Sequence, residues 1–311
     1  MVVVGMFSIF CMIFGLWLSV GDDLNVIYKQ ARRFFLSVVL RSATAWRLHV
    51  RGTVYFGAIQ LGRLLFGYRD YLFPGAFLLL ALTTKPAFPF GNERWDWWMD
   101  ALGFLVALTG QGCRVLAIGS VQNIRRRGRQ KRMAAATLIR TGFFAHSRNP
   151  LYLGNLLIFC GLVIIANSYW WYVLALPGFV GMYWAIVLAE EEFLTKQFGQ
   201  EYAEYCKRVN RFVPCIFSLR HFLVTASFDW KQVVRKETQV VCSWSTLAVG
   251  VLIWERVQQF GFAAREAEIE FLMTAVFAVY CAYGVVLWLK GNGMLHSELP
   301  LATTGWEKSR K

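Results

Sequence analysis

Long apolar runs alternate with shorter, strongly basic segments along this chain. A helix that crosses the roughly 30 Å hydrocarbon core of a bilayer needs about 20 mostly apolar residues. Seven runs approach this length and predict spans over residues 1–20, 71–90, 97–120, 150–168, 169–189, 239–255 and 269–290. The pattern therefore predicts an all-α, polytopic transmembrane protein with about seven spans.

The same pattern suggests three parts. Residues 1–70 combine a first span with a basic, aromatic segment that suits a membrane interface, and residues 71–214 contain the central spans. Residues 215–311 form an extension with two further spans. No basic residue precedes run 1–20 and no small-residue cleavage site follows it, so we expect a retained anchor rather than a signal peptide.

Composition narrows the class of protein. The chain is 57% hydrophobic and only 17% charged, whereas soluble domains carry about 25% charged residues. These values argue against a soluble or a disordered protein. The seven cysteines form no CxxC pair and only four histidines are present, so we expect neither a disulfide scaffold nor a metal site.

The basic residues indicate an orientation. Of the 33 Lys and Arg residues, 28 lie in segments 21–70, 121–149 and 190–237 and in the tail from residue 290. Basic loops face the cytoplasm, so all four segments are predicted there. The run 125–132 lies between two spans and lacks a nucleic-acid module; we expect attraction to anionic lipid, not nucleic-acid binding.

The first candidate site element is segment 142–154. Asn149 is a good N-cap and Pro150 suits the first helical position, so a helix is predicted to start here. Its N-terminal dipole and Arg148 would favour an anionic group such as a carboxylate or phosphate. An ordinary helix start with one snorkelling arginine explains the same residues.

A second element returns to the same membrane face and ends in Glu190-Glu191-Glu192. Consecutive helical residues point about 100° apart, so only one or two of these carboxylates can turn toward a pocket while the rest meet water or Lys196. A solvated helix end would account for them equally well. The hairpin over 150–189 nevertheless places the acids beside segment 142–154.

An amphipathic helix is predicted after the acids. Its apolar stripe consists of Leu194, Phe198, Tyr202, Tyr205 and Val209, and its polar face of Glu201, Glu204, Lys207 and Arg208. Gly199 allows a bend or break before it. Arg208 and Arg211, three residues apart, are candidates for gripping an anion, although an interfacial helix without chemistry explains the stripe fully.

These motifs resemble one known family. The series reads Gly142-x-Phe144-x-x-x-Arg148-Asn149-Pro150-x-Tyr152-x-Gly154, then Glu190-Glu191-x-x-Leu194-x-x-x-Phe198-Gly199-x-x-Tyr202-x-x-Tyr205, then Arg208-Val209-x-Arg211-Phe212-x-Pro214. Its order and spacing are similar to those of the isoprenylcysteine carboxyl methyltransferases, which share their architecture with the membrane phospholipid methyltransferases. The likeness covers roughly residues 100–214.

The resemblance implies S-adenosylmethionine as methyl donor, bound in a pocket that faces the cytoplasm. The implied cofactor-binding residues are Gly142, His146, Arg148, Asn149, Pro150, Tyr152, Gly154 and Glu190. The implied catalytic residues are Glu191, facing the reaction centre, and Arg208 and Arg211, which meet the acceptor. Many relatives have His in place of Asn149 and Tyr in place of Phe144, and an interfacial position explains His146 equally well.

The function expected from these residues is methyl transfer to a lipid-like acceptor, a membrane lipid or a lipidated substrate. Two arginines near the site favour a carboxylate or phosphate acceptor, whereas for an amine Glu191 could remove a proton. The protein is expected in a bacterial inner membrane or an ER-type membrane. Two alternatives stay open: an NADPH-dependent reductase of the membrane sterol type, and a non-catalytic membrane scaffold.

Overall fold

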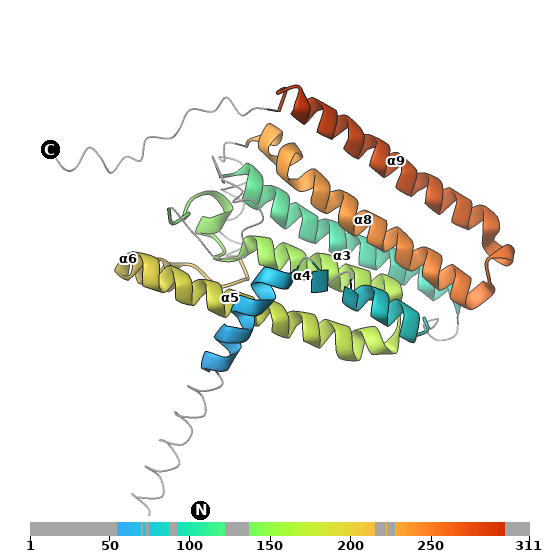
Figure 1. The fold of residues 1–311 in the computed structure, drawn as a ribbon, viewed down its shortest axis with the longest axis horizontal. Coiled ribbons are helices and arrows are strands. Elements are labelled where there is room, and N and C mark those ends of the chain that lie inside the picture. Colours follow the sequence, from blue (N-terminus) through green and yellow to red (C-terminus); the bar gives the residue numbers. More distant parts are fainter. Residues whose placement is uncertain are drawn as a thin grey trace, which may run out of the picture. The chain divides into compact units, whose positions relative to one another are not determined.

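The computed structural model describes residues 55–69, 71–72, 75–86, 92–121, 137–214, 222 and 228–295. By its contacts the chain divides into the units Met1–Gly57 and Ala58–Lys311, and the helices labelled in Figure 1 from α3 onward lie in the second unit. The predicted span over 1–20 and the basic run 125–132 lie outside the described residues. The predicted boundaries at residues 70 and 214 stay predictions.

Every regular element in the described part of the chain is helical, which confirms the all-α class. Residues 55–69 and 75–83 are helical and precede the longer helices. These are α3 (Glu93–Gly119), α4 (Pro150–Ala166), α5 (Leu176–Phe198), α6 (Gln200–Arg208), α8 (Trp230–Phe260) and α9 (Glu266–Gly291). Short helical turns accompany them: η2 (Gly142–Ala145), η3 (Trp171–Ala175) and η4 (Ala263–Arg265).

Within the described ranges, four helical stretches are long and apolar enough to cross a membrane: Arg94–Gly119, Trp171–Phe198, Trp230–Phe260 and Ala263–Gly291. The predicted count of seven spans is not confirmed. The apolar helix α4 has 17 residues, which is short for a span. The run predicted over 71–90 leaves the helical conformation after residue 83, just before Lys85-Pro86, because a proline disfavours the helical conformation of the residue before it.

Helices α3 and α4 pack so closely that glycines are required between them. A Cβ atom on Gly110 would lie 2.5 Å from the carbonyl oxygen of Gly154, and one on Gly161 would lie 2.4 Å from that of Gly103. Membrane helices commonly approach through such small residues, because little hydrophobic force draws helices together inside a lipid. The pairs also show that α3 and α4 run antiparallel.

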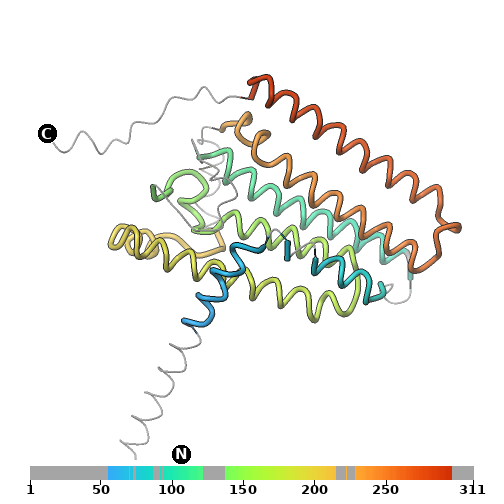
Figure 2. Tube along the Cα trace, in the orientation of Figure 1, coloured from blue at the N-terminus to red at the C-terminus, as the bar shows by residue number. Residues whose placement is uncertain are grey.

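The C-terminal helices pack alongside this pair. Helix α8 contacts both α3 and α4, and α9 contacts α8. Figure 2 shows α3, α4, α8 and α9 lying side by side, with α9 following α8 as a hairpin. Asp229 caps α8 through a hydrogen bond from the Gln232 amide (2.9 Å), and its own amide donates to the carbonyl of Gly119 (2.9 Å). The start of α8 is thereby fixed to the end of α3.

A polar network joins α8 to the interior of the bundle. The Arg114 guanidinium on α3 donates two hydrogen bonds to the Glu237 carboxylate on α8, at 2.8 and 2.9 Å. A third bond runs from Arg114 to Asn155 Oδ1 on α4 (2.6 Å), and Asn155 Nδ2 donates to the Tyr183 hydroxyl on α5 (2.9 Å). This chain of hydrogen bonds connects the extension to the two helices that bear the candidate site.

Candidate active site

The loop that precedes α4 is hydrogen-bonded to a segment that follows α6. Residues 147–149 donate three bonds to the carbonyl oxygens of residues 210–212. They run from Ser147 Oγ to Phe212 (2.7 Å), from the Arg148 amide to Asn210 (2.9 Å) and from the Asn149 amide to Arg211 (3.1 Å). The segment after α6 is therefore fastened over the start of α4.

Helix α4 begins as predicted, but it is capped differently. Pro150 is the first helical residue and Asn149 occupies the N-cap position. The Asn149 side chain makes no capping bond, so that part of the prediction is wrong. Its Nδ2 atom donates instead to the Arg211 carbonyl, at 3.1 Å, because the amide group is turned toward the segment after α6. Asn149 thus ties two parts of the site together.

The Glu191 carboxylate lies at the centre of the site and binds two arginines. It is 8% exposed and accepts two hydrogen bonds from Arg211, at 3.1 Å from Nε and 2.6 Å from Nη2. Arg148 Nη1 lies 3.2 Å from Glu191 Oε1. The Arg211 guanidinium also lies over the Trp184 ring, 5.1 Å from its centroid. Glu191 therefore links α5 to both hydrogen-bonded segments, residues 147–149 and residues 210–212.

Arg148 remains a fixed positive charge in this setting. Its Nη1 atom lies 2.8 Å from Cys206 Sγ on α6. Burial by itself lowers the pKa of Arg148, but the attraction of Glu191, Cys206 and Tyr202 outweighs burial and the pKa is raised. Its Nε atom is buried and has no hydrogen-bond partner among the described residues. One donor of a permanently charged group is thus left available.

The other two acids have different surroundings. Glu190 forms a side-chain hydrogen bond with Tyr152 on α4, and its Oε2 atom is buried without a partner in the described part of the chain. Glu192 faces outward and pairs with Arg63 and Lys196, each at 2.6 Å. Glu190 and Glu191 turn inward and Glu192 meets Lys196, as the helical geometry predicts.

Helix α6 has the predicted amphipathic form. Gly199, with a φ of +52°, separates it from α5. Tyr202 and Tyr205 are buried, and the Tyr205 hydroxyl donates to the Phe144 carbonyl (2.6 Å). Burial raises the pKa of Tyr205, so its hydroxyl stays protonated as this bond requires. Arg208, at the end of the helix, is exposed and forms no ion pair with the described residues.

Three further candidates lie around the loop. Gly142 has a φ of +63°, and a Cβ there would lie 2.5 Å from Ser120 Oγ at the end of α3. His146 packs against the Phe222 ring with 5.2 Å between centroids, and burial lowers its pKa. Gly154 is buried against α3. Their assignment to a cofactor site stays a prediction.

Several residues of this site escaped the sequence analysis. The segment after α6 is contacted by Ser147, and the two arginines at Glu191 are contacted by Cys206 and Trp184. The site is connected to Arg114 and Glu237 through Asn155 and Tyr183. Tyr183 also packs against Tyr152, at 5.4 Å between ring centroids. The one available signal was the charge of Arg114 inside an otherwise apolar run, since a charge within a span requires a partner.

The fold and the site define a helical membrane protein with a polar site at one end of the α4–α5 hairpin. Residues 98–201 match the family model described as phospholipid methyltransferase, which confirms the predicted resemblance to the membrane methyltransferases over that segment. The match contains α4 and the acids of α5. The similarity to membrane methyltransferases therefore rests on the part of the chain that carries α4 and these acids, and it ends before Arg208 and Arg211.

One curated relative shares a comparable stretch. The chain is 32% identical over 127 residues to the cobalt-zinc-cadmium resistance protein CzcN of Cupriavidus metallidurans. The stretch is 40% of this chain and 56% of that protein, so the chain spans little more than half the length of this relative. No solved structure matches the chain.

Proposed function

We propose that the protein transfers a methyl group from S-adenosylmethionine to a lipid-like acceptor. The observation that carries the proposal is a pair of buried, unpartnered polar atoms within the hairpin site, Glu190 Oε2 and Arg148 Nε. Buried polar groups are normally hydrogen-bonded, and an exception calls for an explanation such as a bound ligand. One of these atoms is an acceptor and the other is a donor.

The donor molecule carries groups that are complementary to these two atoms. The amino-acid end of S-adenosylmethionine carries an ammonium group and a carboxylate, which a carboxylate acceptor and a guanidinium donor can bind. Glu190 would bind the ammonium group, held by Tyr152, and Arg148 would bind the carboxylate at the start of α4, where the helix dipole favours an anion. Gly142, His146, Asn149, Pro150 and Gly154 would shape the surroundings.

When bound, S-adenosylmethionine supplies a methyl group that its sulfonium already activates. The protein then has to align the acceptor and keep water out, and little acid–base chemistry is needed. The pairs of Glu191 with Arg148 and Arg211 hold residues 210–212 over the loop and shield the site. Fixed charges in such a shielded site act more strongly than they would in water.

An anionic acceptor is favoured over an amine. Arg208 is exposed and unpaired among the described residues, so its guanidinium is available for a carboxylate or a phosphate. An amine acceptor would need a base to remove its proton. Glu191 suits that role poorly, because both of its carboxylate oxygens already bind arginines.

Thermal unfolding of the purified, full-length protein in detergent tests the cofactor. S-adenosylmethionine and its demethylated product, each at 100 times its dissociation constant, should stabilise the fold by ~2.7 kcal/mol. NADPH should have no effect. Stabilisation by NADPH alone would contradict the proposal and favour the NADPH-dependent reductase. If the protein in nanodiscs responds to none of the three compounds, the non-catalytic scaffold is the function that is left.

The variant Tyr152→Phe tests whether S-adenosylmethionine binds at the site that contains Glu190. Removing the hydroxyl takes a hydrogen bond from Glu190, and we expect roughly tenfold weaker S-adenosylmethionine binding, about the effect of one hydrogen bond to a charged group. Tyr169→Phe, at an exposed tyrosine beyond the other end of α4, is the matched control. Equal affinity of the two variants would contradict the site assignment.

The variant Arg208→Ala tests the acceptor. If Arg208 binds an anionic headgroup, turnover with a carboxylate- or phosphate-bearing lipid should fall about 10- to 100-fold, the loss of one charge-assisted hydrogen bond. S-adenosylmethionine affinity should not change. The neighbouring exposed Lys207→Ala controls for the loss of surface charge. A drop in cofactor affinity with Arg208→Ala would instead assign this arginine to the cofactor.

A further inference from the structure

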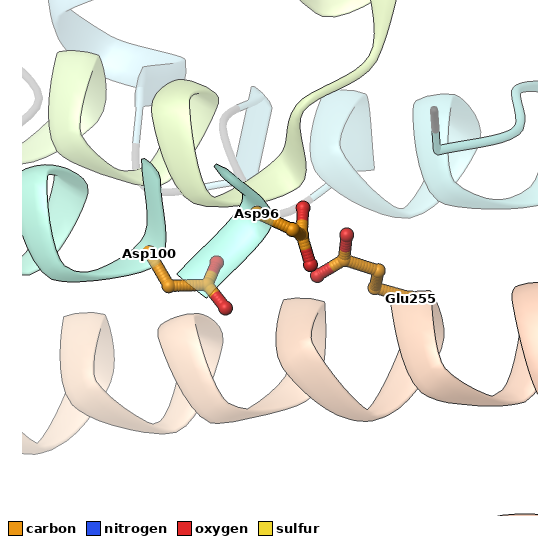
Figure 3. A group of neighbouring side chains, drawn as sticks. All are labelled: Asp96, Asp100 and Glu255. Atoms are coloured by element: carbon orange, nitrogen blue, oxygen red, sulfur yellow. The ribbon is translucent and has the colours of Figure 1, made fainter. Parts of the chain in front are cut away.

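Three carboxylates meet at the opposite end of α3 from the methyl-transfer site. Asp96 and Asp100 lie in the first two turns of α3, and Glu255 lies near the end of α8. One carboxylate oxygen from each residue lies within 4.8 Å of the others. Figure 3 shows the Asp96 and Glu255 groups pointing toward one another, with Asp100 beside them. At 1.5 Å per helical residue, the cluster is roughly 30 Å from the end of α3 that contacts the site.

The cluster carries more negative charge than the protein balances. Asp96 and Glu255 are fully buried and Asp100 is 8% exposed. Arg256 lies 3.3 Å from Asp96 and 3.4 Å from Asp100 and balances one of the three charges. Among the described residues, the other direct contacts are hydrogen bonds from the neutral amide groups of Asn167 and Gln259, at 3.4 and 3.3 Å, and a side-chain hydrogen bond between Asp96 and Glu255. That hydrogen bond requires one of the two groups to hold a proton, so with Asp100 ionised one negative charge remains unbalanced. Unbalanced buried charge is strongly unfavourable.

Oxygen atoms that lack hydrogen-bond partners give a second indication. Glu255 Oε2 and Asp100 Oδ1 are buried and have no hydrogen-bond partner in the described part of the chain. The same is true of Gln259 Oε1, an amide oxygen one helical turn beyond Glu255. All three are oxygens with lone pairs in one small region.

We propose that Asp96, Asp100 and Glu255 bind a divalent cation. The ion would displace the proton that Asp96 and Glu255 share, its double charge would then balance the two charges that Arg256 leaves, and the free oxygens would be its ligands. Carboxylate and amide oxygens suit Mg²⁺, Ca²⁺ and Mn²⁺, whereas softer metals select sulfur or imidazole ligands. The Asp100 side chain is 12% exposed, so an ion can reach the cluster from its edge.

Such an ion would give the C-terminal extension a structural function. It would fasten the end of α8, and with it the turn into α9, to the start of α3. The Asp229 and Arg114 contacts hold the other end of α8 to α3. The proposal does not depend on the methyl-transfer function, because no residue of the cluster belongs to that site.

Mn²⁺ binding to the full-length, chelator-treated protein in detergent tests the proposal. The electron paramagnetic resonance signal of free Mn²⁺ should show one saturable ion per chain, and Mn²⁺ should raise the unfolding temperature. Glu255→Gln should weaken binding at least about tenfold, as loss of one supporting group does in other metal sites. Glu270→Gln, an exposed carboxylate on α9, should bind as the wild type does.

The outcomes are distinct. Absence of saturable binding, or equal binding by Glu255→Gln and Glu270→Gln, would overturn the proposal. If Glu255→Gln does not fold, Asp100→Asn at the exposed edge replaces it, with the same expected loss. An unfolding temperature that depends on pH but not on Mn²⁺ would mean that protons, rather than a metal ion, neutralise the cluster.

Discussion

Replacing Glu191 by glutamine is expected to destabilise the protein by about 3 kcal/mol, the lower end of the range for breaking a buried ion pair. The lower end applies because the Arg211 side chain keeps 30% of its surface exposed. The substitution leaves two guanidinium groups without a carboxylate at the junction of α5 and residues 210–212. Thermal unfolding in detergent should show a fall in the unfolding temperature of roughly 5–10 °C.

The neighbouring acid provides the control for this prediction. Glu192 pairs with Arg63 and Lys196 near the surface, where ion pairs contribute about 0–1 kcal/mol. Glu192→Gln should therefore change the unfolding temperature little. Glu191→Gln should also make residues 208–214 more sensitive to limited proteolysis. Equal stability of the two variants would mean that Glu191 does not hold this segment.

Replacing Glu237 by glutamine should have a comparable or larger effect, about 3–5 kcal/mol. Arg114 and Glu237 are 9% and 3% exposed, and the substitution would leave an arginine charge inside the bundle without a counter-charge. Gln111 on α3 also donates to Glu237, at 3.1 Å, so the change disturbs a wider network. We expect a large drop in unfolding temperature, whereas Glu270→Gln on the surface of α9 should behave as the wild type.

A double variant separates charge from packing. Replacing a whole buried ion pair by apolar residues is often neutral or stabilising, because both desolvation penalties disappear. Arg114→Met with Glu237→Leu should therefore recover much of the stability that Glu237→Gln loses. It should still impair methyl transfer, because Asn155 loses the partner that orients it toward Tyr183. Recovery of both stability and activity would show that the network does not support the site.

Much of this architecture was predictable, because it depends on local physics. The start of α4 at Pro150 follows from the conformation of proline, and the break at Gly199 follows from its positive φ. The burial of Tyr202 and Tyr205 follows from the period of the apolar stripe. The inward turn of Glu190 and Glu191, away from Glu192, follows from the 100° step between helical residues.

What could not be predicted depends on contacts between distant segments. The pattern of charges placed Arg208 and Arg211 together, but Arg211 pairs with Glu191 whereas Arg208 remains exposed. The Asn149 side chain makes no capping bond to α4, because it donates a hydrogen bond to the carbonyl of Arg211 in the distant segment 210–212. The acids at 96, 100 and 255 lie far apart in the sequence and form no metal-ligand motif there, and only the packing of α8 on α3 brings them together.

The glycine pairs between α3 and α4 restrict the route by which an acceptor can reach the site. At Gly110 and Gly161 the two backbones leave no room even for a methyl group, and an acyl chain is far wider. Parting the two helices would break this close packing along much of α4. The lipid-like acceptor that we propose therefore does not enter between α3 and α4. An approach along α5 would let its tail stay among the surrounding lipids while its headgroup reaches Arg208.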